Sequence, residues 1–251
     1  MLGLERRQKI MEKLRLEQKV YVSELAKLFK VTEETIRRDL EKLEAQDLLH
    51  RSYGGAMLTE RTNEDLSYAK RSNINSESKL AIAQKAVPLI SSGDTVMVDA
   101  STTCYALLQQ LKSRKQLTVI TNSVRVMNDF AGSGFTLICT GGDLRPNSCA
   151  LTGPLACRGL AGYYVDFALI SCKGLEQQKG LMESNESEGE IKTQMMQQAR
   201  KTILLADHSK WGKTAFVRFA GFEEIETLVT DIPPAPDWQQ FLAEKEVRLI
   251  D

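Results

Sequence analysis

The residues best suited to binding a ligand stand directly after short apolar runs in the larger, C-terminal part of the chain. The run TVMV is followed by DASTTC, where the candidate ligands are Asp99, Ser101, Thr102 and Thr103. Hydroxyls at the start of a helix, together with its first backbone N–H groups, suit a phosphate or another oxyanion. Ordinary helix capping explains the same hydroxyls equally well.

Further apolar runs end in polar residues of related types. The candidates are Thr121 and Asn122 after LTVI, Lys173 and Gly174 after FALIS, Glu183 and Glu188 in ESNESEGE, and Lys210 in DHSK. A lysine at a strand end can neutralise a phosphate, although most such lysines are solvated. Glu183, Glu188 and Lys192 have a plainer interpretation as a solvated first helical turn, which the helix dipole favours for the acids. His208 has no second histidine nearby, so we expect no metal site and no cofactor.

A different chemistry is carried by TEETIRRDLEKL, which starts at the expected N-cap Thr32. Ile36, Leu40 and Leu43 recur at helical spacing and are expected to face inward. Threonine, arginine and lysine on the opposite face can contact base edges and phosphates in a DNA major groove. A lone pair of arginines would more often mark a solvated helix face. The residues expected on this outward face are Glu34, Thr35, Arg38 and Lys42, with Arg37 at its edge.

The flanking segments make DNA binding the stronger interpretation. ERRQKIMEKLRLEQ predicts a first helix, and SELAKLF predicts a short second helix with Ser23 as its N-cap. The tight turn KVT then gives the helix-turn-helix spacing. LLHRSYGGAML predicts a small hairpin, or wing, in which Arg51 and Tyr53 contact phosphates beside a turn at Gly54.

The polar strand ends of the C-terminal part need a frame that brings them together. From Thr95 onward, short apolar runs alternate with helical stretches, which predicts an α/β fold with a mostly parallel sheet and helices on both faces. Ligands bind at the carboxyl ends of such strands. The polar segment LTERTNEDLSYAKRSNINSES predicts a linker, with a short helix as an alternative within it. The expected organisation is a DNA-binding domain over 1–57, a linker over 58–78 and a ligand-sensing domain over 79–251.

Composition narrows the class of protein further. The chain has 251 residues, 42% of them hydrophobic, and 33 basic residues balance 33 acidic ones, so DNA binding requires a local basic face. Its five cysteines include no CxxC pair, which favours reduced thiols over disulfides or zinc. No secretory segment and no apolar run of roughly 20 residues are apparent. We therefore expect a cytoplasmic protein without a membrane partner.

The segment VSELAKLFKVTEETIRRDLEKLEAQDLLHRSYGGA closely resembles the N-terminal signature of the DeoR family of bacterial transcription regulators. The resemblance implies a winged helix-turn-helix with TIRRDL on the recognition helix and RxxGGA in the wing, and double-stranded operator DNA as partner. The sequence departs from the family at Lys30 and Asp47, where glycine or asparagine often ends a helix. Both departures leave the outward face unchanged.

The C-terminal part resembles the sensor domain of the same family over nearly all of residues 75–251. The matching pieces are KLAIAQKA, DASTT, the TN pair, TGG, VDFALIS, GLMESNESEGEIK and LLADHSK. That domain is similar in fold to ribose-5-phosphate isomerase-like enzymes, which implies a phosphorylated sugar as effector. By this resemblance the DAST loop would bind phosphate with Lys210, while Asn122, Lys173, Glu183 and Glu188 would face the sugar.

An enzyme of that fold would need its catalytic loops. The acidic DGADE motif and the glycine run KGGGG are absent, since SCKGLEQQKG stands in their place, so we expect no catalysis. The expected function is a repressor of a carbohydrate operon, modulated by a phosphorylated sugar and built as a homodimer or homotetramer that pivots in the linker. The alternatives are an activator of the same architecture and a sugar-phosphate isomerase-like enzyme.

Overall fold

The computed structural model describes residues 3–17, 19–45, 48–58, 62–63 and 65–251. Contacts divide the chain into two compact units, Met1–Arg61 and Thr62–Asp251. Asp47, one of the two departures from the family pattern, lies outside the described residues.

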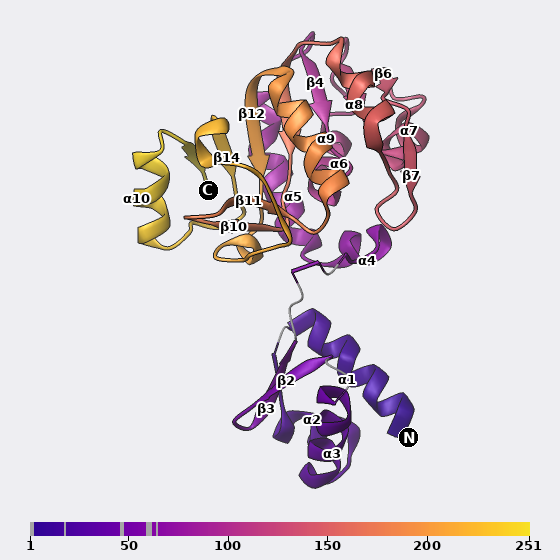
Figure 1. Ribbon diagram of the computed structural model, residues 1–251, viewed down its shortest axis with the longest axis vertical. Coiled ribbons are helices and arrows are strands. Elements are labelled where there is room, and N and C mark those ends of the chain that lie inside the picture. The colour runs from indigo at the N-terminus through magenta and orange to yellow at the C-terminus, as the bar shows by residue number, and fades with distance from the viewer. Residues whose placement is uncertain (1–2, 18, 46–47, 59–61, 64) are drawn as a thin grey trace. The chain divides into compact units, whose positions relative to one another are not determined.

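The N-terminal unit contains three helices and a small antiparallel sheet. The helices are α1 (Gly3–Glu17), α2 (Val22–Phe29) and α3 (Glu33–Glu44); the strands are β1 (Lys19–Tyr21), β2 (Leu49–Ser52) and β3 (Gly55–Leu58), in the order β1-β3-β2 (Figure 1). The expected wing is confirmed by the pairing of β2 with β3. Strand β1 was not predicted, because three residues are too few to show a period.

The start of α2 differs from the prediction. Ser23 is not the N-cap, since Val22 already begins the helix and Tyr21 caps it without a side-chain hydrogen bond. The N–H of Val22 instead donates to the carbonyl of Gly54 in the wing, at 2.9 Å. A tertiary contact thus satisfies the donor that a serine hydroxyl was expected to satisfy.

The end of α2 explains the departure at Lys30. This residue has φ 53° and ψ 48°, the left-handed conformation, and its N–H caps the carbonyls of Ala26 and Lys27. Glycine adopts this conformation without steric cost, and lysine adopts it here with some strain. The turn into α3 is therefore the one the family pattern predicts.

The C-terminal unit is built on a seven-stranded parallel sheet, which confirms the predicted α/β fold. Its order is β15-β14-β12-β9-β4-β5-β6, and every neighbouring pair is parallel. The strands are β4 (Thr95–Val98), β5 (Thr118–Thr121), β6 (Thr136–Cys139), β9 (Val165–Ile170), β12 (Ala199–Leu205), β14 (Thr227–Val229) and β15 (Arg248–Ile250).

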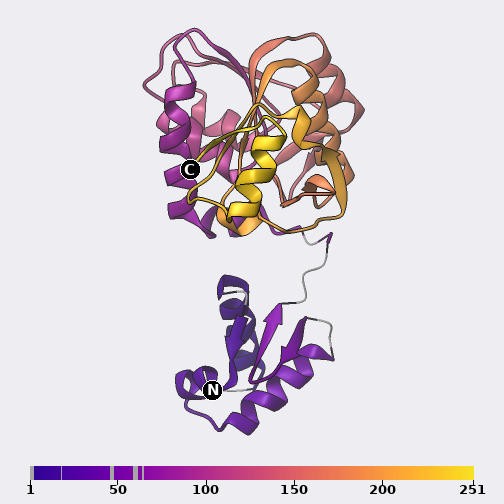
Figure 2. The ribbon, with the colours of Figure 1, turned by 90° about the vertical axis from the view of Figure 1, so that its left-hand side faces the viewer.

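Helices cover both faces of this sheet, as predicted (Figure 2). Val96 and Val98 of β4 pack with α5, α6 and α7, whereas Met97 packs with α8 and α9 on the other face. Alternate residues of one buried strand thus serve two cores, which is why parallel strands lack an apolar-polar alternation. The helices are α5 (Ser76–Ala86), α6 (Thr102–Gln110), α7 (Val124–Phe130), α8 (Gly153–Ala161), α9 (Glu186–Gln197) and α10 (Pro236–Glu244), with 3-10 turns at Val87–Leu89, His208–Lys210 and Phe222–Glu224.

Two small antiparallel sheets were not predicted. One is the hairpin of β7 (Asp143–Arg145) and β8 (Ala150–Thr152), and the other has the order β10-β11-β13. The latter contains β10 (Gly174–Glu176), β11 (Gly180–Glu183) and β13 (Val217–Ala220). Glu183 therefore ends a strand, and Glu188 lies in the first turn of α9.

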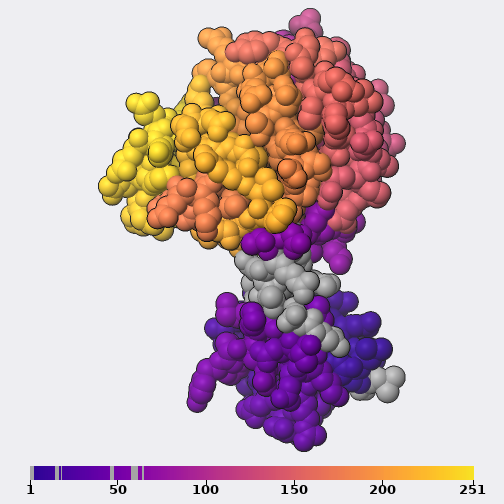
Figure 3. All heavy atoms as spheres, viewed as in Figure 1, coloured from indigo at the N-terminus to yellow at the C-terminus, as the bar shows by residue number. Residues whose placement is uncertain are grey.

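The predicted linker over 58–78 is too long. Residues 65–78 belong to the C-terminal unit and contain α4 (Tyr68–Asn73) and the start of α5. Tyr68 is buried, and its N–H donates to the carbonyl of Asn147 at 2.7 Å. Figure 3 shows these residues as purple atoms against the orange atoms of the same unit. The short helix that the sequence allowed within the linker is thus α4, which packs on the C-terminal unit through Tyr68 and Tyr105.

No helix in the described part of the chain is both long and apolar enough to cross a membrane.

Candidate functional sites

The outward face of α3 is arranged as the helical spacing predicts. Thr32 is the N-cap, and its Oγ1 accepts the N–H of Thr35 at 3.3 Å. Ile36 is fully buried, whereas Arg37 and Arg38 beside it are exposed. Glu34 and Lys42 are exposed as well, so the predicted face is accessible to a partner as large as a DNA duplex.

Each arginine on this face is held by a glutamate one turn earlier. Arg37 Nη2 lies 2.7 Å from Glu33 Oε2, and Arg38 Nε lies 3.4 Å from Glu34 Oε1. Exposed pairs of this kind contribute less than about 1 kcal/mol. They therefore orient the guanidinium groups without preventing exchange for a phosphate or a base edge.

The wing turns at Gly54, which has φ +82°. Tyr53 beside it is fully exposed. Arg51 is held back toward α3, because its N–H donates to Glu44 at 2.9 Å and its Nε lies 2.5 Å from the same carboxylate. Contact of Arg51 with DNA phosphate would require exchange of this partner.

Asp39 is a functional support that the sequence reasoning missed. It is 4% exposed within α3, and its carboxylate lies 2.5 Å from Arg6 Nε and 3.3 Å from Arg7 Nη1. These ion pairs fasten α3 to α1. A signal was present, since Asp39 lies on the inward side with Ile36 and Leu40.

In the C-terminal unit, a buried ion-pair network lies at the carboxyl ends of the central strands. Asp99, directly after β4, is 2% exposed and accepts the N–H groups of Ser101 and Ser171 at 2.9 and 3.0 Å. Lys192 Nζ of α9 lies 2.6 Å from Asp99 Oδ2 and 3.2 Å from Glu183 Oε2. Glu183 and Lys192 are thus no solvated helical turn, which corrects that interpretation.

The charges in this network stabilise one another. Burial by itself lowers the pKa of Lys192, but the carboxylates of Asp99 and Glu183 more than offset it and hold the pKa above the ordinary value. Burial raises the pKa of Asp99, and the ammonium of Lys192 with the hydrogen bonds from Ser101 and Ser171 lowers it further than burial raises it. Both groups are therefore charged at neutral pH.

A small cavity lies beside the network. Its volume of about 10 Å³ is near the minimum for one water molecule, so a larger ligand requires the walls to move. The cavity brings together four of the predicted site residues with four others. Its lining is Arg71, Asp99, Ala100, Ser101, Asn122, Glu188, Ile191 and Lys192.

The other predicted residues are not among the described residues that line this cavity. Thr102 and Thr103 form the first turn of α6, which Ser101 caps by accepting the N–H of Cys104 at 3.1 Å. Thr121 Oγ1 donates to the carbonyl of Val98 at 2.7 Å, a structural role. Gly174 is buried in β10, where a Cβ would meet backbone atoms. Lys173 is half-buried, and Lys210 Nζ lies 3.9 Å from Asp207 Oδ2.

Residues 65–75, which the sequence assigns to the linker, cover this edge of the sheet. At one end, Arg145 Nη2 lies 2.6 Å from Asp65 Oδ2. At the other end, Asn75 Nδ2 donates to Asp207 Oδ1 at 3.1 Å. Between them, α4 contributes Arg71 to the cavity. We define the roof as residues 65–75.

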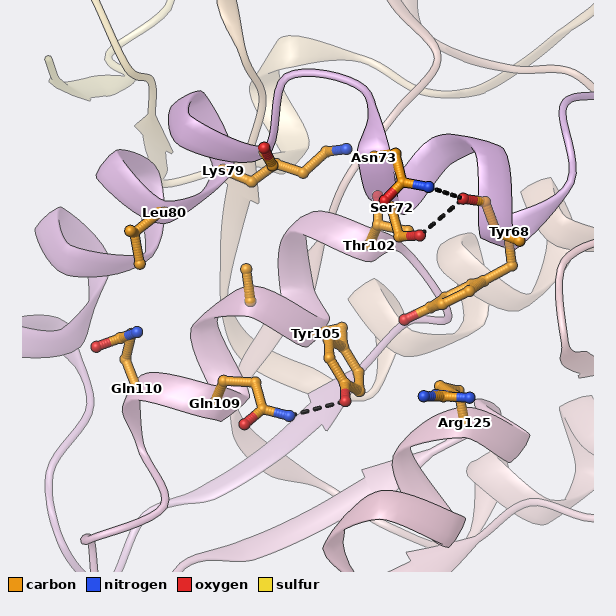
Figure 4. A pocket seen from close by; sticks show the side chains of 13 residues that line it. Tyr68, Ser72, Asn73, Lys79, Leu80, Thr102, Tyr105, Gln109, Gln110 and Arg125 are labelled. Atoms are coloured by element: carbon orange, nitrogen blue, oxygen red, sulfur yellow. Dashed lines mark hydrogen bonds between the residues drawn. The ribbon is translucent and has the colours of Figure 1, made fainter.

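A larger cavity of about 500 Å³ lies on the other side of α4, between α4, α5, α6 and α7 (Figure 4). The hydroxyls of Tyr68 and Tyr105 and the side chain of Arg125 face it (Figure 4). Thr102 is the one predicted effector-site residue in its described lining. Helix α4 is thus a wall shared by two cavities.

An N-terminal helix-turn-helix with an exposed basic face, joined to an α/β unit with a polar ligand edge, defines a ligand-sensing transcription regulator. A family model described as a DeoR-like helix-turn-helix domain matches residues 6–62, and one described as the DeoR C terminal sensor domain matches residues 74–232. The chain belongs to the DeoR family.

Characterised and uncharacterised regulators are similar over almost the whole chain. The uncharacterized HTH-type transcriptional regulator YulB of Bacillus subtilis is 39% identical over 99% of this chain and 96% of its own. The transcriptional repressor GlcR of the same organism is 36% identical over 96% and 93%. The glycerol-3-phosphate regulon repressor of Escherichia coli is 30% identical over 93% and 94%. The prediction of a regulator rather than an enzyme is confirmed.

Among solved structures, ribose 5-phosphate isomerase A from Methanocaldococcus jannaschii is 20% identical to the chain, with a TM-score of 0.40 over 55% of each chain.

Proposed function

We propose that this regulator represses a carbohydrate operon and is released from its operator by a small phosphorylated sugar. It acts in the cytoplasm on double-stranded DNA, as a homodimer or homotetramer. A single recognition helix covers only one half-site, so selective binding requires repeated or inverted half-sites. The names of two related repressors support repression as the direction of control. One of them is named for the glycerol-3-phosphate regulon, which supports a phosphorylated ligand.

The observation that carries the ligand class is a set of buried polar atoms without hydrogen-bond partners in the described structure. Asn122 Oδ1 beside the small cavity and Asn185 Nδ2 at the N-cap of α9 belong to this set, whereas Glu188 Oε1 lies 3.3 Å from Arg145 Nε in an ion pair. Native proteins leave few such atoms unpaired, and sugar hydroxyls are both donors and acceptors. The first turn of α6, capped by Ser101, supplies the N–H groups that suit the phosphate.

The decisive experiment uses the full chain and the DNA upstream of its own gene. Binding of the fragment is measured in gel shifts without ligand and with glycerol 3-phosphate, glucose 6-phosphate, glycerol or glucose. A phosphorylated probe should release the DNA when its free parent does not. In a deletion strain a promoter reporter should rise; a fall would identify an activator instead. If none of the phosphorylated probes releases the DNA, a phosphorylated effector of this kind is contradicted. The same holds if a free parent compound releases the DNA equally well.

On the DNA side, we expect Arg38→Ala to weaken binding by about 1–3 kcal/mol and to relax base choice, because a guanidinium on the reading face discriminates between bases. The measurement is affinity of the full chain for sites selected from a random duplex library. The control is Lys9→Ala, which removes an exposed cation paired with Glu5 on α1. Unchanged affinity and selectivity of the Arg38 variant would place the reading face elsewhere.

The remaining site assignments are part of the same proposal. Thr35, Arg37 and Lys42 would contact the groove or its phosphates next to Arg38, and Tyr53 and Arg51 would contact phosphate from the wing. In the C-terminal unit, Asn122, Lys173 and Glu188 would face the ligand. Asp99 and Glu183 would act through Lys192, since their carboxylates are already paired with it.

A further inference from the structure

The roof carries a charged side chain whose hydrogen-bonding capacity is incompletely used. Arg71 of α4 lines the small cavity, and its Nε donates to the carbonyl of Leu66 at 3.1 Å. Its Nη2 is buried and has no hydrogen-bond partner among the described residues. A buried guanidinium N–H without a partner is costly, so such a group indicates a ligand that completes it.

Positive charge at this place is only partly compensated, since the carboxylates of Glu183 and Asp65 act on Lys173 from beyond ion-pair distance and the ring of Tyr68 lies 5.9 Å from the guanidinium carbon of Arg71. Among the described residues, no carboxylate lies within ion-pair distance of Arg71 or Lys173, whereas Lys192 is already paired with Asp99 and Glu183. Burial and, next, the nearby guanidinium of Arg71 lower the pKa of Lys173. An anion beside Arg71 would reduce its repulsion with Lys173 and supply a partner for the unpaired Nη2 of Arg71.

We propose that Arg71 binds the phosphate of the effector directly, opposite the first turn of α6 and together with Lys173. This inference rests on the proposed function, because the phosphate belongs to the sugar that releases DNA. A guanidinium presents parallel N–H donors that match two phosphate oxygens, and Arg71, which lines the cavity, has an unused donor at Nη2. The effector site is thus completed by a residue from the roof.

The assignment makes α4 the moving part of the sensor. A cavity of about 10 Å³ does not admit a sugar phosphate, so the roof shifts when the ligand enters. The far side of α4 borders the cavity of about 500 Å³ shown in Figure 4, which leaves room for that shift. Through Nε, Arg71 holds the carbonyl of Leu66, a few residues after the N-terminal unit ends at Arg61. A ligand that binds the shifted arrangement better thereby biases the segment leading to the DNA-binding unit.

The test compares full-length wild type with Arg71→Gln, Arg71→Lys and the control Arg125→Gln. Arg125 is an exposed cation paired with Asp129 at 2.6 Å and faces the larger cavity. Thermal unfolding is followed against inorganic phosphate, glycerol 3-phosphate and glucose 6-phosphate. Binding of a phosphorylated probe to Arg71→Gln should weaken at least about tenfold, as expected for loss of charge-assisted hydrogen bonds. Arg71→Lys should retain part of the affinity, and Arg125→Gln all of it.

The melting temperature without ligand separates binding from a structural role. Glutamine can still donate to Leu66, and removal of the charge relieves Lys173, so unliganded Arg71→Gln should be as stable as wild type. A clear loss of unliganded stability would overturn the direct role, as would a variant that binds the probe like wild type. If Arg71→Gln binds the probe like wild type, the proposed function still stands. If none of the phosphorylated probes stabilises wild type, both the inference and the proposed ligand class fail.

Discussion

Replacing Lys192 by methionine should lower the free energy of unfolding of the C-terminal unit by about 3–5 kcal/mol, because two buried carboxylates lose their shared cation. Asp99 and Glu183 are 2% and 3% exposed, so water cannot replace the ammonium group. Methionine is long enough to fill the space of the lysine side chain. The decrease in the free energy of unfolding therefore reports the lost charge more than a change in volume. The ligand edge loses its support at the same time, so the effector response should disappear.

Denaturation of the full chain in urea, followed by circular dichroism, measures this effect on the C-terminal transition. The control is Lys201→Met, which removes a cation 2.6 Å from Glu226 on the surface and should cost less than about 1 kcal/mol. The pH dependence gives a second criterion. In wild type the pKa of Asp99 is lowered, so its stabilisation is present at neutral pH and is lost only as pH falls through that value. In the variant a carboxyl can take up a proton, so the difference from wild type should shrink as pH falls. Equal stability of the two lysine variants would show that the network is not a source of stability.

Asp39→Ala should abolish most operator binding without touching the reading face. The change leaves the side chain of Arg6, 11% exposed, without its carboxylate, at a cost of about 3–5 kcal/mol. A core below roughly 70 residues rarely supplies more than about 3–5 kcal/mol, so the N-terminal unit would be largely unfolded. DNA affinity then falls in proportion to the folded fraction.

The measurement combines affinity for the selected operator with hydrogen exchange of α3 in the full chain. Asp39→Ala should exchange fast along the whole helix, whereas Arg38→Ala should lose affinity with normal protection. Glu41→Ala is the matched control, since it removes an exposed carboxylate from the same helix. Normal protection of α3 in Asp39→Ala would show that the ion pairs to Arg6 and Arg7 do not hold it.

Some of this architecture follows from local spacing alone. Ile36 and Leu40 are four residues apart, and that distance by itself turns Arg37 and Arg38 outward. The alternation of apolar runs with helical stretches likewise predicts parallel strands whose carboxyl ends meet at one edge, which places Asp99, Ser101 and Asn122 near one another. These inferences succeed because the pattern lies within a single element or repeats in chain order.

The pairings of charges far apart in the chain follow from the folded structure. Lys192 looks like a residue of a solvated helical turn until Asp99, 93 positions earlier, is placed against it. Asp39 meets Arg6 across 33 positions. The roof of residues 65–75 has little apolar surface, so no hydrophobic period marks it as folded, and Arg71 enters the candidate site only because the chain doubles back over the sheet. Periodicity is a local property, so the sequence is sufficient to predict a winged helix-turn-helix followed by a parallel α/β unit. The partner of a buried charge depends on topology, and the folded structure alone supplied it.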